Sequence, residues 1–307
     1  MVWYQKMFID KYSVHIKGVL WAISVLVTLS IFGNVVHNFS DILNVQLLRQ
    51  DGFYSWVVLL LCVLWIWIKR SEIDISNAKI DDRWLCLGVG LFIPALVLLN
   101  YLSVSIASLP LKIFAISLVA VSSFCIFFGR ASKVPFMLLI IYGIAVGLPL
   151  FIETLFSSSF SMVTALVSTS TLRFFGVPVS LVGVKVSLTS LNGSDIVTMV
   201  DARCSGSDSI AIFFAIFGLM LMDRKPKNLV VLGLFILGLA GTFIQNFIRL
   251  LLLFAAGYYY GSDSLWLVHD YASYILFPIW FLAFSLIYVR YTNGNKNGSY
   301  NNAKEFE

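Results

Sequence analysis

Long apolar runs constrain this chain more than any other feature of its sequence. Several of them reach the roughly 20 residues that a helix needs to cross a bilayer. Hydrophobic residues make up 59% of the 307 residues and charged residues only 12%, whereas a soluble domain has about 25% charged residues. The sequence therefore predicts a polytopic membrane protein.

The predicted fold class is all-α, with about eight transmembrane helices. We place the spans at 18–36, 53–68, 84–104, 110–130, 135–153, 207–222, 229–256 and 271–289. They divide the chain into an N-terminal five-span region (1–152), an intervening polar region (153–203), a three-span region (204–290) and a tail (291–307). The tail is rich in Asn and Gly and is predicted to be disordered.

The polar region has two parts with different periodicity. From 153 to 175, apolar residues recur at helical spacing on one face, which favours a helix lying in the membrane interface: Phe156, Phe160, Val163, Val167 and Phe174. From Gly176 the period changes to two, and Asn192-Gly193 indicates a hairpin with a return strand at 196–200. Lipid cannot satisfy the edges of a β-hairpin, so we expect it outside the hydrocarbon, as a wall or lid over the cysteine at position 204.

Basic residues are distributed unequally between the loops. With eight spans, both termini lie on one side, which receives 15 of the 21 lysines and arginines against six on the other. Cytoplasmic loops carry the excess of basic residues. The sequence thus predicts a multi-pass plasma-membrane protein with cytoplasmic termini and an external polar region. The same bias explains the net charge of +5 without a nucleic-acid partner.

One of the four cysteines stands apart. Cys204 lies at the probable N-terminus of the helix that forms the sixth predicted span, where unpaired N–H groups and the helix dipole favour a thiolate. Arg203 acts in the same direction, and Asp208 opposes it. The remaining three lie in or beside apolar runs, where cysteine packs as a small hydrophobe: Cys62, Cys86 and Cys125. Cys204 is the candidate nucleophile, and the cysteine spacing predicts neither a disulfide nor a metal site.

Two more reactive side chains fall near the same face as Cys204. Arg249 interrupts the apolar seventh span, and a charge at that depth costs at least a few kcal/mol, which makes it a functional candidate. The alternative is that Arg249 snorkels to the outer headgroups, although Gln245 and Asn246 one turn below favour a polar cavity. His269 stands at the head of the eighth span, where the alternative is an ordinary interfacial histidine.

Together these groups predict acyl transfer. A thiolate attacks a peptide carbonyl, a guanidinium stabilises the oxyanion or holds a carboxylate, and an imidazole moves protons. The sequence has no His-Glu-x-x-His zinc motif, no Gly-x-Ser-x-Gly nucleophile turn and no aspartate pair within the spans. We therefore expect neither a metal nor another cofactor.

The motifs also resemble a known family. The chain resembles the exosortase/archaeosortase family in a hairpin followed by Cys-Ser-Gly at the head of a span (Cys204, Ser205 and Gly206). It is also similar in an Asn-x-x-Arg motif (Asn246 and Arg249) and in a basic residue at the head of the next span (His269). The resemblance covers roughly 177–280 and implies that Cys204, Arg249 and His269 are catalytic. Ser205, Gly206 and Asn246 are expected to support the site or bind substrate. Arg203 is expected to support the site as well, because it neighbours the thiol, although it is not part of the motif.

The resemblance implies a membrane transpeptidase without a cofactor. Its partners would be exported proteins that end in a short motif, a transmembrane helix and a basic cluster, and an acceptor that is a lipid in some members. Two alternatives stay open on the residues alone. One is an intramembrane cysteine protease that uses water. The other is a transporter or assembly factor in which Arg249 binds an anionic group, although the sequence lacks the repeat symmetry common in transporters.

Overall fold

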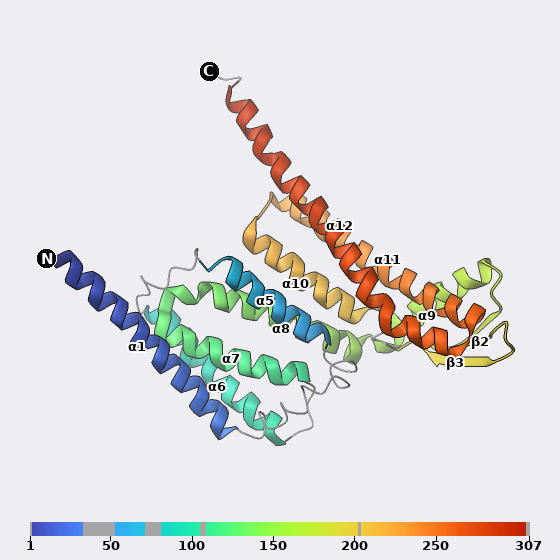
Figure 1. Ribbon diagram of the computed structural model, residues 1–307, viewed down its shortest axis with the longest axis horizontal. Coiled ribbons are helices and arrows are strands. Elements are labelled where there is room, and N and C mark those ends of the chain that lie inside the picture. The colour runs from blue at the N-terminus through green and yellow to red at the C-terminus, as the bar shows by residue number, and fades with distance from the viewer. Residues whose placement is uncertain (1, 33–52, 71–80, 105–108, 202–203, 305–307) are drawn as a thin grey trace. The chain divides into compact units, whose positions relative to one another are not determined.

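The computed structural model describes residues 2–32, 53–70, 81–104, 109–201 and 204–304 (Figure 1). The chain forms two compact units, Met1–Val146 and Gly147–Glu307. The first contains helices α1 (Val2–Ile31), α5 (Phe53–Ile68), α6 (Asp82–Val104) and α7 (Leu109–Phe128), the 3-10 helix η1 (Gly129–Ser132) and most of α8 (Lys133–Leu155). The second contains α9 (Ser157–Phe174), strands β1 (Val179–Val182), β2 (Lys185–Thr189) and β3 (Asp195–Met199), and helices α10 (Ser207–Asp223), α11 (Asn228–Tyr260) and α12 (Ser262–Lys304).

Every predicted span overlaps a helix, but fewer segments are long and apolar enough to cross a membrane. In the described part of the chain these are Asp82–Leu102, Pro110–Leu155, Asn228–Tyr260 and Ser262–Thr292. Pro110–Leu155 combines α7, η1 and α8, and two further apolar helices are shorter, His15–Ile31 and Tyr54–Ile68. The mostly helical membrane protein is confirmed, whereas eight crossings and the domain boundaries stay predictions.

The last helix differs most from its prediction. The sequence places the eighth span at 271–289 after a loop, but α11 runs to Tyr260 and α12 begins at Ser262. Only Gly261, with φ +92°, separates them. Hydropathy marks the apolar part of a helix rather than its ends, and a nucleated helix is extended at small cost per residue. Helix α12 also continues to Lys304, through the tail predicted to be disordered.

In the first unit, α6 and α7 pack together through an apolar core. Leu99 of α6 and Val119 of α7 are fully buried at its centre. Helix α1 contacts α7, where Trp21 Nε1 donates a hydrogen bond to Ala120 O at 2.9 Å. Packing of apolar side chains therefore accounts for this part of the fold.

The sheet of the second unit has three antiparallel strands in the order β1-β2-β3, one more than the predicted hairpin. The missed turn is Gly183-Val184, which joins Val182 to its partner Lys185. Gly183 has φ +63°, as the first residue of a type II′ turn requires. The predicted turn at Asn192-Gly193 is present within the loop between β2 and β3, where Gly193 has φ +80°.

Helix α9 turns directly into this sheet. Gly176, with φ +81°, ends the helix in a Schellman cap, in which Gly176 N donates to Arg173 O at 2.9 Å and Val177 N to Leu172 O at 3.0 Å. Arg173 Nε then donates to Val179 O of β1 at 2.9 Å. These bonds fix the start of the sheet against the end of α9.

Helix α9 buries its small and hydroxyl-bearing side and leaves its apolar side open. Its buried residues include Ser161, Thr164, Ala165, Ser168 and Thr169. Of the apolar residues predicted to share one face, Val163 is 53% exposed and Phe174 is 85% exposed. The predicted helix is thus confirmed, and its open apolar face suits the interface, although that location stays a prediction.

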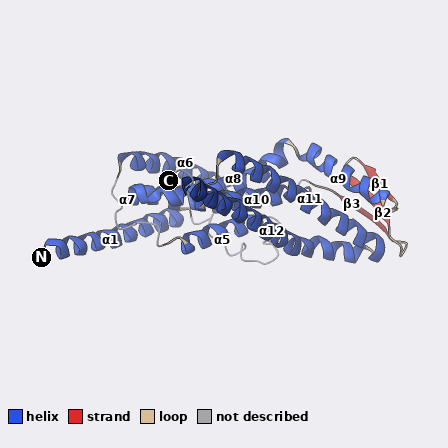
Figure 2. Ribbon diagram, turned by 90° about the horizontal axis from the view of Figure 1, so that it is seen from above, coloured by secondary structure: helices blue, strands red, loops and turns tan. Residues whose placement is uncertain are grey.

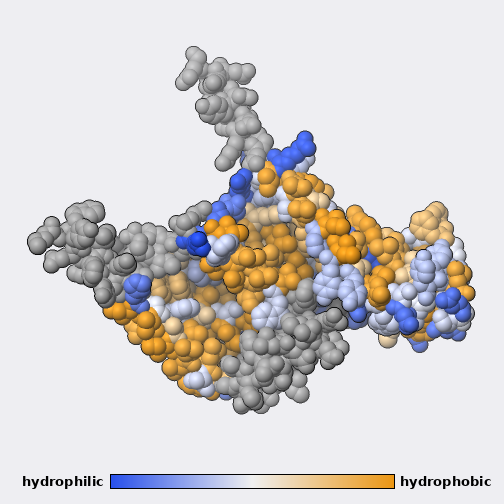
Figure 3. Space-filling model, viewed as in Figure 1, coloured by the Kyte–Doolittle hydropathy of each residue, from blue (hydrophilic) through white to orange (hydrophobic). Residues whose placement is uncertain are grey.

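The sheet packs against α11 and reaches the candidate nucleophile. Val186, Leu188 and Ile196 share a buried cluster with Leu250, Leu253 and Phe254 of α11, and Cys204 packs against the same cluster. At the far loop, Leu191 N donates to Tyr258 O at 2.8 Å. Figure 2 shows the strands, in red, beside these helices, and Figure 3 shows hydrophilic residues gathered around the sheet while apolar residues cover the helices. The expected wall beside the cysteine is present.

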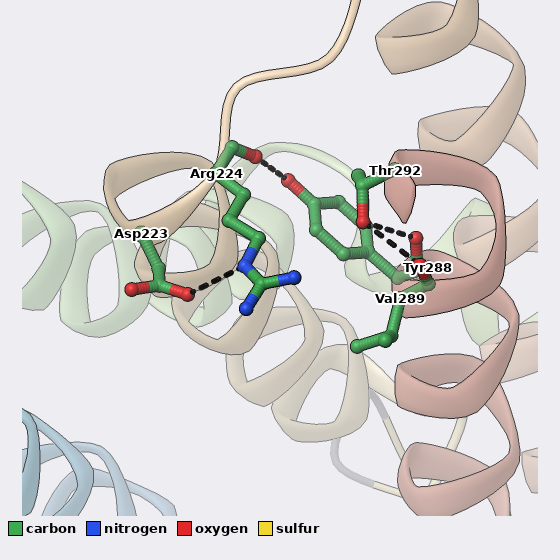
Figure 4. Close-up of polar contacts among 5 residues, drawn as sticks. All are labelled: Asp223, Arg224, Tyr288, Val289 and Thr292. Atoms are coloured by element: carbon green, nitrogen blue, oxygen red, sulfur yellow. Dashed lines mark hydrogen bonds and ion pairs between the residues drawn. The ribbon is translucent and has the colours of Figure 1, made fainter. Parts of the chain in front are cut away.

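A polar cluster joins the C-terminal end of α10 to α12 (Figure 4). Tyr288 OH donates to the carbonyl oxygen of Arg224, and Thr292 Oγ1 donates to Tyr288 O at 3.0 Å. Arg224 Nε lies 3.6 Å from Asp223 Oδ2. These contacts anchor α12 to the end of α10.

Candidate active site

Cys204 lies in a tight turn between β3 and α10. Its backbone N donates to Asp201 Oδ1 at 2.7 Å, and Ser205 N donates to Asp201 O at 3.1 Å. Its carbonyl oxygen accepts a hydrogen bond from Asn246 Nδ2 of α11 at 3.1 Å. The peptide groups on both sides of the thiol are therefore held by side chains from separate elements.

Gly206 allows this turn to approach α11. Its φ of +108° lies in the left-handed region, which side chains with a Cβ rarely adopt. A Cβ there would also lie 2.9 Å from Asn246 Cγ. The Gly of the Cys-Ser-Gly motif is thus needed both for its backbone and for the contact that Asn246 makes with Cys204.

His269 of α12 brings an imidazole beside the thiol. Its Nε2 lies 3.7 Å from Cys204 Sγ, and its Nδ1 lies 3.4 Å from Asp270 Oδ1. The ring of Trp266, one turn earlier, packs edge-on at a centroid distance of 5.4 Å. His269 is therefore within reach of the thiol proton.

Arg249 is buried within the protein, with 9% of its surface exposed. Its NH1 donates to Ser273 Oγ of α12 at 3.0 Å, and its charge acts on the Cys204 thiol. Burial against α12 is not the geometry of a side chain that snorkels to headgroups. Consecutive helices thus bring a thiol, a guanidinium and an imidazole together at one site.

One comparison with known proteins identifies a family. A family model described as transmembrane exosortase matches residues 47–286, well over half of the chain. The chain belongs to the transmembrane exosortase family. The match extends beyond the expected 177–280 and takes in α5 to α8. No curated protein and no solved structure matches this exosortase.

The thiol of this exosortase is not the expected thiolate. Burial, above all, raises the pKa of Cys204 to about 12; the Asp201 carboxylate adds to the shift and Arg249 opposes it. Cys204 precedes the N-cap Gly206 and so lies outside the first turn of α10, where the helix dipole is effective. The opposing carboxylate is also Asp201 rather than Asp208. At neutral pH the thiol is protonated, and the chemistry needs a base.

The remaining predicted site residues and cysteines differ in burial. Ser205 is fully buried in the turn, and Arg203 lies outside the described residues. Among the other cysteines, Cys62 and Cys125 are buried as expected, whereas Cys86 is exposed on α6. The described residues contain no cluster of His, Cys, Asp or Glu that could hold a metal.

Sequence analysis did not identify two residues of the site. Asp201 lies three residues before Cys204, a spacing at which an aspartate often caps a turn. Ser273 lies four residues after His269, so α12 presents both on one face. Either spacing could have drawn attention to these residues, but neither is specific without the partner helix in place.

Proposed function

We propose that this exosortase is a membrane cysteine transpeptidase that cleaves C-terminal sorting signals of exported proteins and passes the new C-terminus to an acceptor. The observation that carries the proposal is the 3.7 Å approach of Cys204 Sγ to His269 Nε2. A thiol beside an imidazole suits nucleophilic acyl transfer, and a buried guanidinium on the adjacent helix can stabilise the oxyanion.

In the first half of the reaction, His269 Nε2 takes the thiol proton as Sγ attacks the carbonyl carbon of the scissile peptide. A C–S bond forms and the carbonyl electrons move to oxygen. The imidazolium then gives its proton to the leaving nitrogen, the C–N bond breaks, and a thioester remains on Cys204. Because burial holds the pKa of Cys204 high, this proton transfer accompanies the attack rather than preceding it.

Arg249 stabilises the negative charge that develops on the carbonyl oxygen. Its guanidinium stays protonated near neutral pH and cannot act as a base. In the buried setting of α11 a fixed positive charge acts more strongly than in water. Ser273 Oγ holds one end of the guanidinium, which limits the reorganisation needed when charge appears.

In the second half, an acceptor nucleophile attacks the thioester. His269 takes the acceptor's proton, the C–S bond breaks, and the thiolate recovers a proton from the imidazolium. A lipid amine or hydroxyl completes transpeptidation, whereas water completes hydrolysis. The same first half serves both outcomes, so the acceptor decides between transpeptidase and protease.

The substrates in this proposal are exported proteins with a short motif, a transmembrane helix and a basic cluster at the C-terminus. The bias of 15 basic residues against six supports cytoplasmic termini and an external site in the plasma membrane. A substrate helix anchored in the same bilayer would bring its motif to the level of Cys204.

The test is to capture the thioester. The purified full chain is mixed with an exported protein that carries such a signal, and the intact mass is measured after rapid quenching. Wild type should gain the mass of the acyl group and lose it on treatment with hydroxylamine. His269→Gln should form the adduct far more slowly, with a changed pH profile. Absence of any hydroxylamine-sensitive adduct in wild type would overturn the thioester mechanism.

A further inference from the structure

Four polar atoms on α11 beside the catalytic residues have no hydrogen-bond partner among the described residues. They are Nε2 and Oε1 of Gln245, Oδ1 of Asn246 and Nε of Arg249, all shielded from solvent. The three residues are only 6%, 2% and 9% exposed, respectively. Buried polar groups are normally bonded, because an unpaired one destabilises the folded protein. A set of four calls for an explanation.

The helix places these atoms next to the nucleophile. Residues four apart lie on one face of a helix, and long side chains lean toward its N-terminus, so Arg249 leans over Gln245. Asn246, between them in sequence, bonds the carbonyl oxygen of Cys204. Asn246 bonds Cys204 directly, and the charge of Arg249 acts on its thiol. A chain bound at Cys204 would therefore lie close to the turn of α11 that carries these atoms.

The chemistry of the set fits a peptide group. Gln245 Nε2 and Arg249 Nε donate hydrogen bonds, whereas Gln245 Oε1 and Asn246 Oδ1 accept them. A carboxylate would satisfy the donors and be repelled by the acceptors, whereas a peptide supplies one N–H and one C=O. Exchanging the amide N and O of Gln245 leaves the same donor and acceptor unpaired, since neither atom has a partner among the described residues. The amide orientation of Asn246 is fixed by its hydrogen bond to Cys204.

We propose that Gln245, together with Arg249 Nε and Asn246 Oδ1, binds a backbone peptide group of the substrate close to the scissile bond. The inference rests on the proposed function and adds a residue that recognises any extended polypeptide, whatever its motif. Because the four atoms are shielded in the resting site, substrate binding moves neighbouring side chains aside. The groups left unpaired at rest are then satisfied by the substrate and improve its binding.

The test compares two reagents that alkylate Cys204 with the same warhead. Acetyl-tetra-alanyl chloromethyl ketone carries a peptide backbone, and chloroacetone carries none. In both, sulfur attacks the chloromethyl carbon, a C–S bond forms and chloride leaves. Rates at Cys204 are read by peptide mass spectrometry, and their ratio isolates backbone recognition from thiol reactivity. In Gln245→Met the ratio should fall roughly 5- to 30-fold relative to wild type.

A matched control lies one turn earlier on α11. The hydroxyl of Thr242 is fully used, donating to Gly238 O at 2.8 Å and accepting from Trp280 Nε1 at 3.1 Å. Thr242→Val should lower Tm and leave the ratio unchanged. Gln245→Met removes unpaired atoms, so its Tm should stay level or rise. An unchanged ratio in Gln245→Met overturns the inference.

A second measurement changes the reagent, and its main arm uses wild type. Replacing one alanine of the reagent by lactate removes one N–H, and at the position bound by Gln245 this should slow alkylation of wild type. The same replacement should cause no additional loss in Gln245→Met. If lactate has no effect at any position, the inference fails. If wild type shows no preference for the peptidyl reagent at all, it is the peptidase function that fails.

Discussion

The α6–α7 pair and the α11–α12 pair both consist of long apolar helices, but they treat buried polar side chains differently. On α7, the Oγ of Ser122 donates to a carbonyl of its own helix at 3.0 Å. On α11 and α12 the bonds cross between helices, from Arg249 NH1 to Ser273 Oγ at 3.0 Å and from Trp280 Nε1 to Thr242 Oγ1 at 3.1 Å. Ser122 thus bonds within its own helix, whereas Arg249 and Trp280 connect α11 with α12.

This difference separates packing from chemistry. Apolar and small side chains suffice to hold membrane helices together, as Leu99 and Val119 do between α6 and α7. A buried guanidinium is expensive there and persists where a function needs it. The pair that carries Arg249 also carries His269 and the unpaired amide of Gln245. The residues of the proposed site therefore lie in the second unit, whereas apolar packing dominates the contact of α6 with α7 in the first.

The largest expected effect is the loss of Cys204. Cys204→Ala should lower processing of a signal-bearing substrate at least about 10³-fold, because the described residues around the site include no second thiol to act as nucleophile. Processing is followed by immunoblot in cells and by single-turnover kinetics with purified protein. Membrane insertion should not change, since the side chain lies in a turn outside α10.

Cysteines of the first unit are the matched controls. Cys125→Ala and Cys86→Ala replace one buried and one exposed thiol, and each should retain activity. If either of them abolished processing while Cys204→Ala did not, the assignment of chemistry to the second unit would be wrong.

The next prediction compares a buried arginine of the second unit with an exposed arginine of the first. Arg249→Lys keeps the charge but loses the planar fork that reaches Ser273 and the substrate, so kcat should fall roughly 10²- to 10³-fold. Arg130→Lys in the first unit changes a residue that is 79% exposed and paired with Asp81 at 2.8 Å. It should leave kcat unchanged. Equal losses in both variants would show that the effect of Arg249 is not catalytic.

Much of this comparison could be predicted from the sequence. Apolar runs mark helices because lipid demands them, and reactive residues such as Arg249 and His269 are conspicuous inside such runs. The third strand was missed because a two-residue turn at Gly183 leaves little trace within a run of valines. Helix ends were missed because hydropathy does not report them.

The electrostatics of the site could not be predicted in the same way. The pKa of Cys204 depends on how deeply the sheet and α11 bury it, and on the carboxylate of Asp201, which a turn brings back to it. The contacts of Ser273 and the unpaired atoms of Gln245 likewise depend on neighbours distant in sequence. Sequence reasoning therefore supplied the candidate residues but not the environment that sets their protonation.

A smaller effect contrasts two glycines. Gly206→Ala strains a residue at φ +108° and brings its Cβ to 2.9 Å from Asn246 Cγ, which should destabilise the fold by about 1–3 kcal/mol. Gly90→Ala on α6 meets no atom within 4 Å and should stabilise the helix by up to about 1 kcal/mol. Thermal unfolding in detergent measures both. A Tm for Gly206→Ala equal to that of wild type would contradict the turn geometry.

The smallest effect concerns the carboxylate beside the thiol. Asp201→Asn keeps an oxygen that accepts the Cys204 N–H but removes the charge that helps to raise the thiol pKa to about 12. A nearby negative charge disfavours the thiolate, so its removal lowers the pKa. The thiolate fraction at each pH below about 12 then increases, and the iodoacetamide alkylation profile of Cys204 should move to lower pH. Cys86 in the same protein is the internal control, because its profile should not move. A shift at both cysteines would indicate a general change of conformation. No shift at Cys204 would mean that burial and the charge of Arg249, rather than Asp201, set its pKa.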